Sequence, residues 1–169
     1  MNRRFLLAVF LVALSVSMRL IPHPLNLTPA GAVALFSGAC FDRKRWSFIV
    51  PFAALLASDL LGHTFHQLTF VVYAAFALNI VIGMLIRDRR QSPAAVAAGA
   101  TASATIFYAV TNFAMWTIST IYPKTFAGLV TCYVAAIPFY GTMLAGDLIY
   151  SALLFGTFVW VERRSPAAA

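Results

Sequence analysis

Long apolar runs, separated by short basic or proline-containing stretches, dominate this sequence. Six of the runs predict helices that span a lipid bilayer. They cover residues 5–20, 28–41, 46–61, 68–86, 93–117 and 139–161. A helix rises about 1.5 Å per residue and the hydrocarbon core is about 30 Å thick, so residues 28–41 are short for the distance.

A seventh apolar run, residues 126–137, is too short to span the bilayer. Pro123 precedes it, Pro138 follows it, and Thr125 is placed to cap its start. The run therefore predicts a short interfacial or re-entrant helix between the fifth and sixth spans. The predicted fold class is all-α: one polytopic membrane domain over residues 1–169, with six transmembrane helices and this short additional helix.

Two further signals concern how the helices begin and pack. Thr28 is the expected N-cap of the second span, with Pro29 in its first turn. The fifth span opens with small residues four apart, at Ala94, Ala98 and Ala102. Such residues let helix backbones approach closely. We expect this face to pack inside the protein, and docking of a partner subunit is the alternative.

The composition supports the membrane assignment. The chain is 62% hydrophobic and only 10% charged, too few polar groups to cover a soluble domain. Its net charge of +7 raises the question of nucleic acid. We exclude that class because the basic residues form short clusters between apolar runs rather than one stripe, as orientation signals do.

The basic residues also predict an orientation. With a cytoplasmic N-terminus, only Arg19 and Lys124 lie outside, and ten basic residues lie inside. The inner ten are Arg3, Arg4, Arg43, Lys44, Arg45, Arg87, Arg89, Arg90, Arg163 and Arg164. We therefore expect a multi-pass protein of the inner membrane with both termini in the cytoplasm. A cleaved secretory signal at residues 1–20 is the alternative, and it leaves the other spans in the same orientation.

Two similar pentapeptides, LASDL at residues 56–60 and LAGDL at 144–148, place aspartates inside apolar runs. The chain has only five acidic residues, so these two are conspicuous. An aspartate at the centre of a spanning helix costs about 2.5–3.5 kcal/mol on insertion scales, and less near an interface. The predicted orientation puts Asp59 and Asp147 in the outer half of the membrane, where they should face the bundle, a wet cavity or each other.

Other polar residues are predicted at the same level, and together they suggest a pocket open to the outside. Trp116 and Tyr133 would stack on or cover a planar ligand, and Asn112 would hydrogen-bond it. The alternative is structural: Asp59 sits at the interface, and Asp147 pairs with Arg19 as a brace. The predicted substrate-binding residues are Arg19, Asn26, Asp59, Asn112, Trp116, Tyr133 and Asp147.

Sequence motifs for enzyme chemistry are missing. There is no His-Glu-x-x-His zinc motif, Gly-x-Ser-x-Gly elbow or phosphate-binding Gly-rich loop. His63 and His66 are three apart but lie in a predicted loop, and Cys40 and Cys132 fall toward opposite faces, which disfavours a disulfide. We predict no catalytic residues, metal site or cofactor, and a protein that is not an enzyme.

Several sequence blocks resemble a family of small bacterial membrane proteins. The blocks occur in order over most of the chain: residues 19–24, 26–29, 34–38, 58–60, 111–116, 122–129, 132–133, 135–139 and 146–148. That family is similar in size and layout to the substrate-binding S components of energy-coupling factor (ECF) transporters. The resemblance implies a six-helix fold that captures a vitamin-like micronutrient from the outer face. Its implied partners are the ligand, the lipid bilayer, a separate transmembrane subunit and two ATPases.

The docking pattern of that family is not reproduced. Many S components carry Ala-x-x-x-Ala in the first helix, whereas this first span has Ala8 and Ala13. A transporter that works without a partner subunit is therefore an alternative. We expect a membrane substrate-binding or transport protein. The alternatives are a structural or assembly subunit without a ligand, and a small membrane enzyme that uses the aspartates and histidines.

Overall fold

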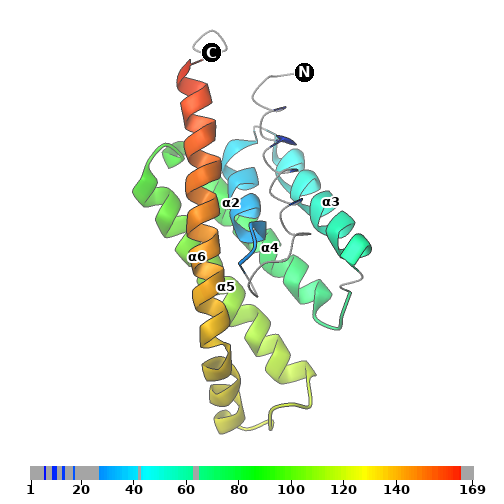
Figure 1. Cartoon of the computed structure of the whole chain (residues 1–169). Coiled ribbons are helices and arrows are strands. Elements are labelled where there is room, and N and C mark those ends of the chain that lie inside the picture. Colours follow the sequence, from blue (N-terminus) through cyan, green and yellow to red (C-terminus); the bar gives the residue numbers. More distant parts are fainter. Residues whose placement is uncertain are drawn as a thin grey trace.

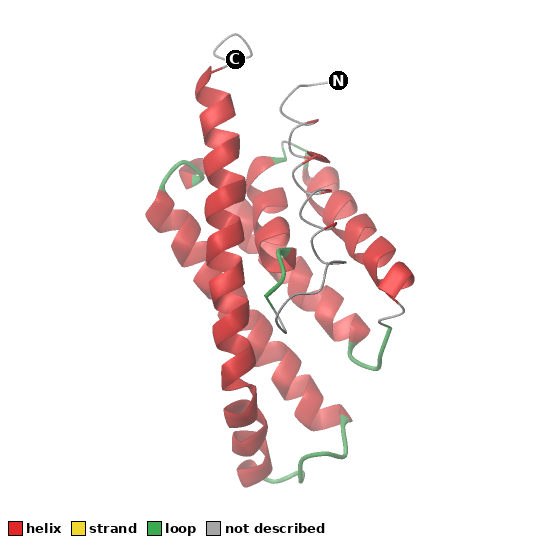
Figure 2. Cartoon of the chain, viewed as in Figure 1, coloured by secondary structure: helices red, strands yellow, loops and turns green. Residues whose placement is uncertain are grey.

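A computed structural model describes residues 27–41, 43–62 and 65–164, together with Leu6, Val9, Phe10, Ala13 and Ser17. These residues form helices and connecting loops without a strand, so the predicted all-α class is confirmed for them (Figures 1 and 2). The helices are α2 (Ala30–Cys40), α3 (Lys44–Gly62), α4 (Thr69–Leu85), the 3-10 helix η2 (Arg87–Arg89), α5 (Pro93–Ile118) and α6 (Phe126–Arg164).

Helices α2 to α5 begin and end within two residues of the predicted limits. The first predicted span falls on residues of which only the five named above are described. Two of the helices, α5 and α6, are long and apolar enough to cross a membrane. Length and composition alone give this result, and the shorter apolar helices α2 and α4 do not meet the same length.

The predicted separate helix at residues 126–137 is wrong. It is the first part of α6, which runs for 39 residues with Pro138 inside it, about 58 Å at helical rise. Proline removes one backbone hydrogen bond but does not by itself end a helix whose two sides pack on the same neighbour. Here Tyr133 before the proline and Tyr140 after it both bond α5, through the Ala109 carbonyl and the Thr105 hydroxyl.

One of the two predicted helix caps is confirmed. The Gly128 N–H donates to Thr125 Oγ1 over 3.1 Å, as predicted. Ser92 caps α5 by accepting from the Ala95 N–H, with Pro93 in the first turn. The predicted N-cap, Thr28, is wrong. Pro29 occupies the N-cap position of α2, and it makes no side-chain cap hydrogen bond.

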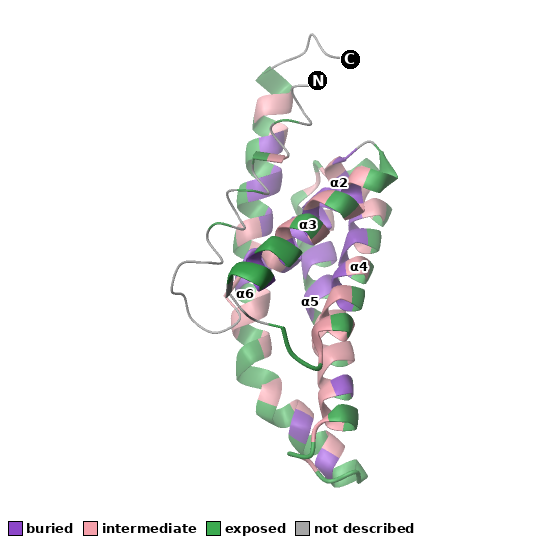
Figure 3. Ribbon diagram, turned by 90° about the vertical axis from the view of Figure 1, so that its right-hand side faces the viewer, coloured by how far each residue is buried: buried purple, intermediate pink, exposed green. Residues whose placement is uncertain are grey.

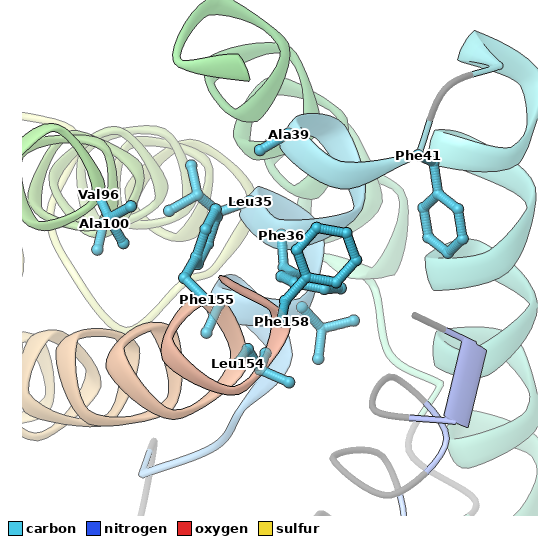
Figure 4. Close-up of a cluster of buried hydrophobic side chains, with 11 residues drawn as sticks. Leu35, Phe36, Ala39, Phe41, Val96, Ala100, Leu154, Phe155 and Phe158 are labelled. Atoms are coloured by element: carbon cyan, nitrogen blue, oxygen red, sulfur yellow. The ribbon is translucent and has the colours of Figure 1, made fainter. Parts of the chain in front are cut away.

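Helix α2 lies at the centre of the described bundle. Nine of its 11 residues are buried, and it contacts α3, α4, α5 and α6. Its Phe36 ring meets Phe155 and Phe158 of α6 edge-on, with ring centroids 5.3 and 5.4 Å apart (Figure 4). Edge-to-face aromatic pairs of this kind add about 0.5–1.5 kcal/mol beyond their burial. The main hydrophobic core thus joins α2 to the second half of α6.

Helix α2 crosses α4 at backbone contact distance. A β-carbon on Gly38 would overlap the Ile80 carbonyl, and one on Gly83 would overlap the Leu35 carbonyl. The two glycines therefore face each other's helices and allow the close approach. In α5 the corresponding small-residue prediction is wrong in its register: Ala94, Ala98 and Ala102 are exposed, because the buried face carries Val96, Gly99, Ala100, Ser103 and Ala104.

The α5–α6 hairpin extends beyond the ends of α2, α3 and α4 (Figures 1 and 3). Tyrosines hold its two helices together. The Tyr108 hydroxyl donates to the Tyr133 carbonyl over 2.7 Å, and the Tyr133 hydroxyl donates to the Ala109 carbonyl over 2.6 Å. Large apolar side chains of this part, such as Phe126 and Val134, stay exposed on the outside of the hairpin.

The basic loops meet at one end of the molecule, which we call the arginine end. Arg87 bonds carbonyls at the end of α2, and Arg90 pairs with Glu162 near the end of α6. The α2–α3 loop joins the same end because α2 terminates there. The described basic residues at this end are Arg43, Lys44, Arg45, Arg87, Arg89, Arg90, Arg163 and Arg164, whereas Lys124 lies at the tip of the hairpin.

Candidate functional site

The seven predicted substrate-binding residues do not share one neighbourhood among the residues that the structure describes. Arg19 and Asn26 lie outside the described residues. Asp147 lies at the start of α2, whereas Asp59 lies between α3 and α4. The other three, Asn112, Trp116 and Tyr133, belong to the far part of the α5–α6 hairpin.

Asp147 occupies the N-terminal end of α2. Its side chain is buried, and its carboxylate interacts with the backbone N–H of Ala32. The carboxylate also lies against Gly31, where a β-carbon would overlap it. The first N–H groups of a helix have no partner within the helix, and this end carries a partial positive charge. Asp147, which belongs to α6, therefore caps the N-terminus of α2 with its carboxylate, where Pro29 has no side-chain acceptor to offer.

Arg87 caps the C-terminal end of α2. Its Nη2 donates to the Gly38 carbonyl over 2.9 Å and to the Phe41 carbonyl over 2.7 Å. The last carbonyls of a helix lack partners and carry a partial negative charge, so a cation stabilises them. The central helix is thus held at its two ends by an acid from α6 and a base that follows α4.

The hairpin residues make structural contacts. The Asn112 side chain donates to the Tyr108 carbonyl of its own helix over 2.8 Å. Trp116 Nε1 donates to the Pro123 carbonyl over 2.9 Å, and the Lys124 ammonium bonds the carbonyls of Trp116 and Ser119. These contacts close the turn between α5 and α6, because they satisfy carbonyls at the end of α5.

Asp59 lies beside α4. It is 6% exposed, and its Oδ2 accepts a hydrogen bond from the Tyr73 hydroxyl over 3.0 Å. The Tyr73 ring stacks on Phe52 of α3, with centroids 5.7 Å apart. The stacked ring holds the hydroxyl at the carboxylate, so Tyr73 of α4 contacts α3 through one face of its ring and through its hydroxyl.

A cavity of about 420 Å³ opens beside this pair, between the end of α3 and the start of α4. Small-molecule sites usually measure about 300–1,000 Å³ and combine aromatic walls with a few polar groups. His66 Nδ1 accepts from the Leu68 N–H over 3.1 Å, which leaves Nε2 for other contacts. The lining residues are Leu56, Phe65, His66, Thr69, Phe70 and Tyr73.

The two aspartates lie at a similar depth. Asp59 is about 22 Å along α3 from Lys44, and Asp147 is about 25 Å along α6 from Arg164, at about 1.5 Å per residue. Both are therefore in the half of the bundle that is remote from the arginine end. Of the two, only Asp59 is joined through a side chain to a wall of the cavity.

Metal-ligating residues do not gather in the described part of the chain: no group of three histidine, cysteine or acidic side chains lies close enough to hold an ion. Both cysteines are free thiols. Cys132 is buried, and its Sγ contacts the Asn112 carbonyl at 3.5 Å, in line with a packing role.

Sequence reasoning missed Tyr73 and Arg87. Tyr73 was visible only as one hydroxyl within the apolar run of α4, and Arg87 was counted only as a charge that sets orientation. Neither contact could be found from spacing, because Tyr73 and Asp59 are 14 residues apart and Arg87 and Phe41 are 46 apart. Helix packing alone creates both pairs.

A family model described as "Family of unknown function (DUF6580)" matches residues 1–168. No curated protein matches the chain, and no solved structure matches it.

Proposed function

The chain belongs to DUF6580, a family of unknown function, and we propose that it is a multi-pass membrane protein that captures a small, vitamin-like ligand at its outer face. The single observation that carries the proposal is the cavity of about 420 Å³ beside the buried Asp59–Tyr73 pair. Aromatic walls suit a planar ligand, and the imidazole of His66 offers it a hydrogen bond.

The membrane part of the proposal rests on charge and length. Every described basic residue except Lys124 lies at the arginine end, as expected if that end faces the cytoplasm. Helices α5 and α6 are long and apolar enough to cross the bilayer. We propose that the shorter α2, α3 and α4 cross beside them and that the first apolar run completes six spans of the bacterial inner membrane, with both termini in the cytoplasm.

This proposed layout is similar to that of the S components of ECF transporters, in which capture at the outer face is separate from the energy source. The sequence offers no phosphate-binding Gly-rich loop, so movement of the ligand would be powered by a separate transmembrane subunit with ATPases. The cavity is at the end remote from the arginines, as capture from outside requires.

The test is a thermal-shift screen of the purified full chain in detergent against vitamins, their precursors and divalent metal ions. A ligand at 100 times its Kd stabilises by about 2.7 kcal/mol. For a protein of this size, that corresponds to roughly 5–11 °C in Tm. A compound that binds the cavity should shift the wild type and should lose its effect when the cavity is filled.

Leu56→Trp is the filling variant, because Leu56 lines the cavity and is 45% exposed. Leu78→Trp is its matched control, because Leu78 of α4 is also 45% exposed but lies away from the cavity. We expect the shift to vanish in the first variant and to persist in the second. A compound that shifts Leu56→Trp as strongly as the wild type would show that the ligand binds elsewhere.

A structural or assembly subunit is the second candidate. The observation that favours it is the use of Asp147 as a helix cap and of Trp116 in the hairpin turn, which gives these residues roles without a ligand. Under this proposal no compound in the screen raises Tm, although Asp147→Ala lowers it. The same experiment therefore separates the two candidates.

A further inference from the structure

A groove of about 440 Å³ lies between α5 and α6 at the arginine end. Its walls are mostly apolar and include small residues, among them Ala97, Ala152 and Gly156. A β-carbon on Gly156 would meet nothing within 4 Å, so the groove is open beside this glycine. The groove is separate from the cavity between α3 and α4, because the two share no residue.

Two polar atoms on this groove lack partners among the described residues. Ser151 lines the groove and is 1% exposed, yet its buried hydroxyl makes no hydrogen bond. The buried Nε of Arg90, at the mouth, also makes none, although Arg90 Nη2 pairs with Glu162 over 3.2 Å. Buried polar groups are normally hydrogen-bonded, so the unpaired Nε of Arg90 leaves a charged donor for a ligand at the mouth of the groove.

The mouth of the groove is positively charged. Arg90 and Arg163 line it, and the guanidinium of Arg164 lies 4.1 Å from the ring centroid of Trp160, another lining residue. Among the described residues, Glu162 is the acid that pairs with this group, so three arginines exceed it by two charges. A basic mouth with a tryptophan is typical of a membrane interface and favours an anionic headgroup.

The length of the groove matches one leaflet of a bilayer. From Arg163 at the mouth to Leu148 at the far end, it follows α6 for about 22 Å. Half of a bilayer of about 40–45 Å, headgroups included, is about the same length.

We propose that the groove binds one anionic phospholipid of the inner leaflet. The phosphate lies at the mouth, between Arg90 and Arg163, and an acyl chain follows the small residues of α5 and α6. This proposal rests on the membrane orientation given above but not on the capture of a vitamin-like ligand.

The test adds dioleoyl phosphatidylglycerol or dioleoyl phosphatidylcholine to the delipidated full chain in detergent and counts bound lipid by native mass spectrometry. One basic residue near an anionic lipid is worth about 1 kcal/mol, or about fivefold in Kd. We expect one phosphatidylglycerol to bind more tightly than phosphatidylcholine. Arg163→Gln should weaken phosphatidylglycerol about fivefold, whereas Arg43→Gln, another exposed arginine at the same end, should leave its Kd unchanged.

Filling the groove with a larger side chain is an independent test of the same proposal. Gly156→Leu should abolish tight binding of both lipids, and Gly141→Leu should abolish neither, because Gly141 also faces open space but is not on the groove. Equal Kd values for the two lipids, or full binding by Gly156→Leu, would overturn the proposal. A vitamin-dependent thermal shift that persists while lipid binding fails would overturn the lipid site alone, and the reverse result would overturn the vitamin site alone.

Discussion

Gly31→Ala and Asp147→Ala are expected to be strongly non-additive, because a β-carbon on Gly31 would occupy the space of the Asp147 carboxylate. Each substitution alone removes the cap of α2: the first displaces the carboxylate, and the second deletes it. Together they relieve the overlap, since the atoms that the new β-carbon would meet first belong to the Asp147 side chain. Coupled neighbours of this kind interact by about 0.5–3 kcal/mol.

The magnitudes follow from the capping geometry. Loss of an N-cap costs about 0.5–2 kcal/mol, and loss of a buried charge at a helix end costs up to about 2 kcal/mol. Deletion of the carboxylate also removes its own burial penalty, so we expect about 2 kcal/mol for Asp147→Ala rather than the sum. Gly31→Ala should cost a similar amount. In the Asp147→Ala background the same change should be neutral or should stabilise by up to about 1 kcal/mol, because alanine favours the helix.

The assay is thermal unfolding of the full chain in detergent. Each single variant should lower Tm by roughly 4–8 °C, and the double variant should lie no lower than Asp147→Ala. Asp88→Ala in η2 and Gly141→Ala in α6 are the controls, since Asp88 is exposed and Gly141 faces open space. Additive losses in the double variant, or a Gly31→Ala protein as stable as the wild type, would refute the capping role of Asp147.

Three more outcomes are expected in the same assay. Arg87→Met should lower stability by about 2 kcal/mol, because two carbonyls at the end of α2 lose a charged donor, whereas Arg89→Met, on an exposed side chain, should have no effect. Gly83→Ala should cost about 1–3 kcal/mol by forcing α2 and α4 apart, and an unchanged Tm would contradict the close crossing. Tyr108→Phe should cost about 1 kcal/mol and speed amide exchange in the far hairpin, which an unaltered exchange pattern would disprove.

Helix type and helix limits could be predicted for α2 to α5 because the signals are local. Apolar run length and residues such as Ser92 and Pro93 act within a few positions of the chain. The same local logic failed at Pro138, where proline argued for a break. The tyrosine contacts with α5 on both sides of Pro138 keep the helix continuous, and no local pattern encodes them.

For the candidate site, too, the sequence predicted some features and not others. The sequence marked Asp59 and Asp147 as costly acids within apolar runs, and both are indeed buried. It could not assign their partners, because an aspartate within an apolar run fits a ligand, a cation or a helix end equally well. In the structure, the Asp147 carboxylate contacts the start of α2, and Asp59 accepts a hydrogen bond from Tyr73.

The sequence by itself determined the all-α class, the positions of most helices and the separation of basic residues from apolar runs, since each depends on composition and on neighbours along the chain. The tertiary structure decided which charges hold the ends of α2, which glycines permit its crossing with α4, and where the cavity and the groove open. Those features require residues far apart in the chain to meet, and only the packing of one helix on another fixes which of them do.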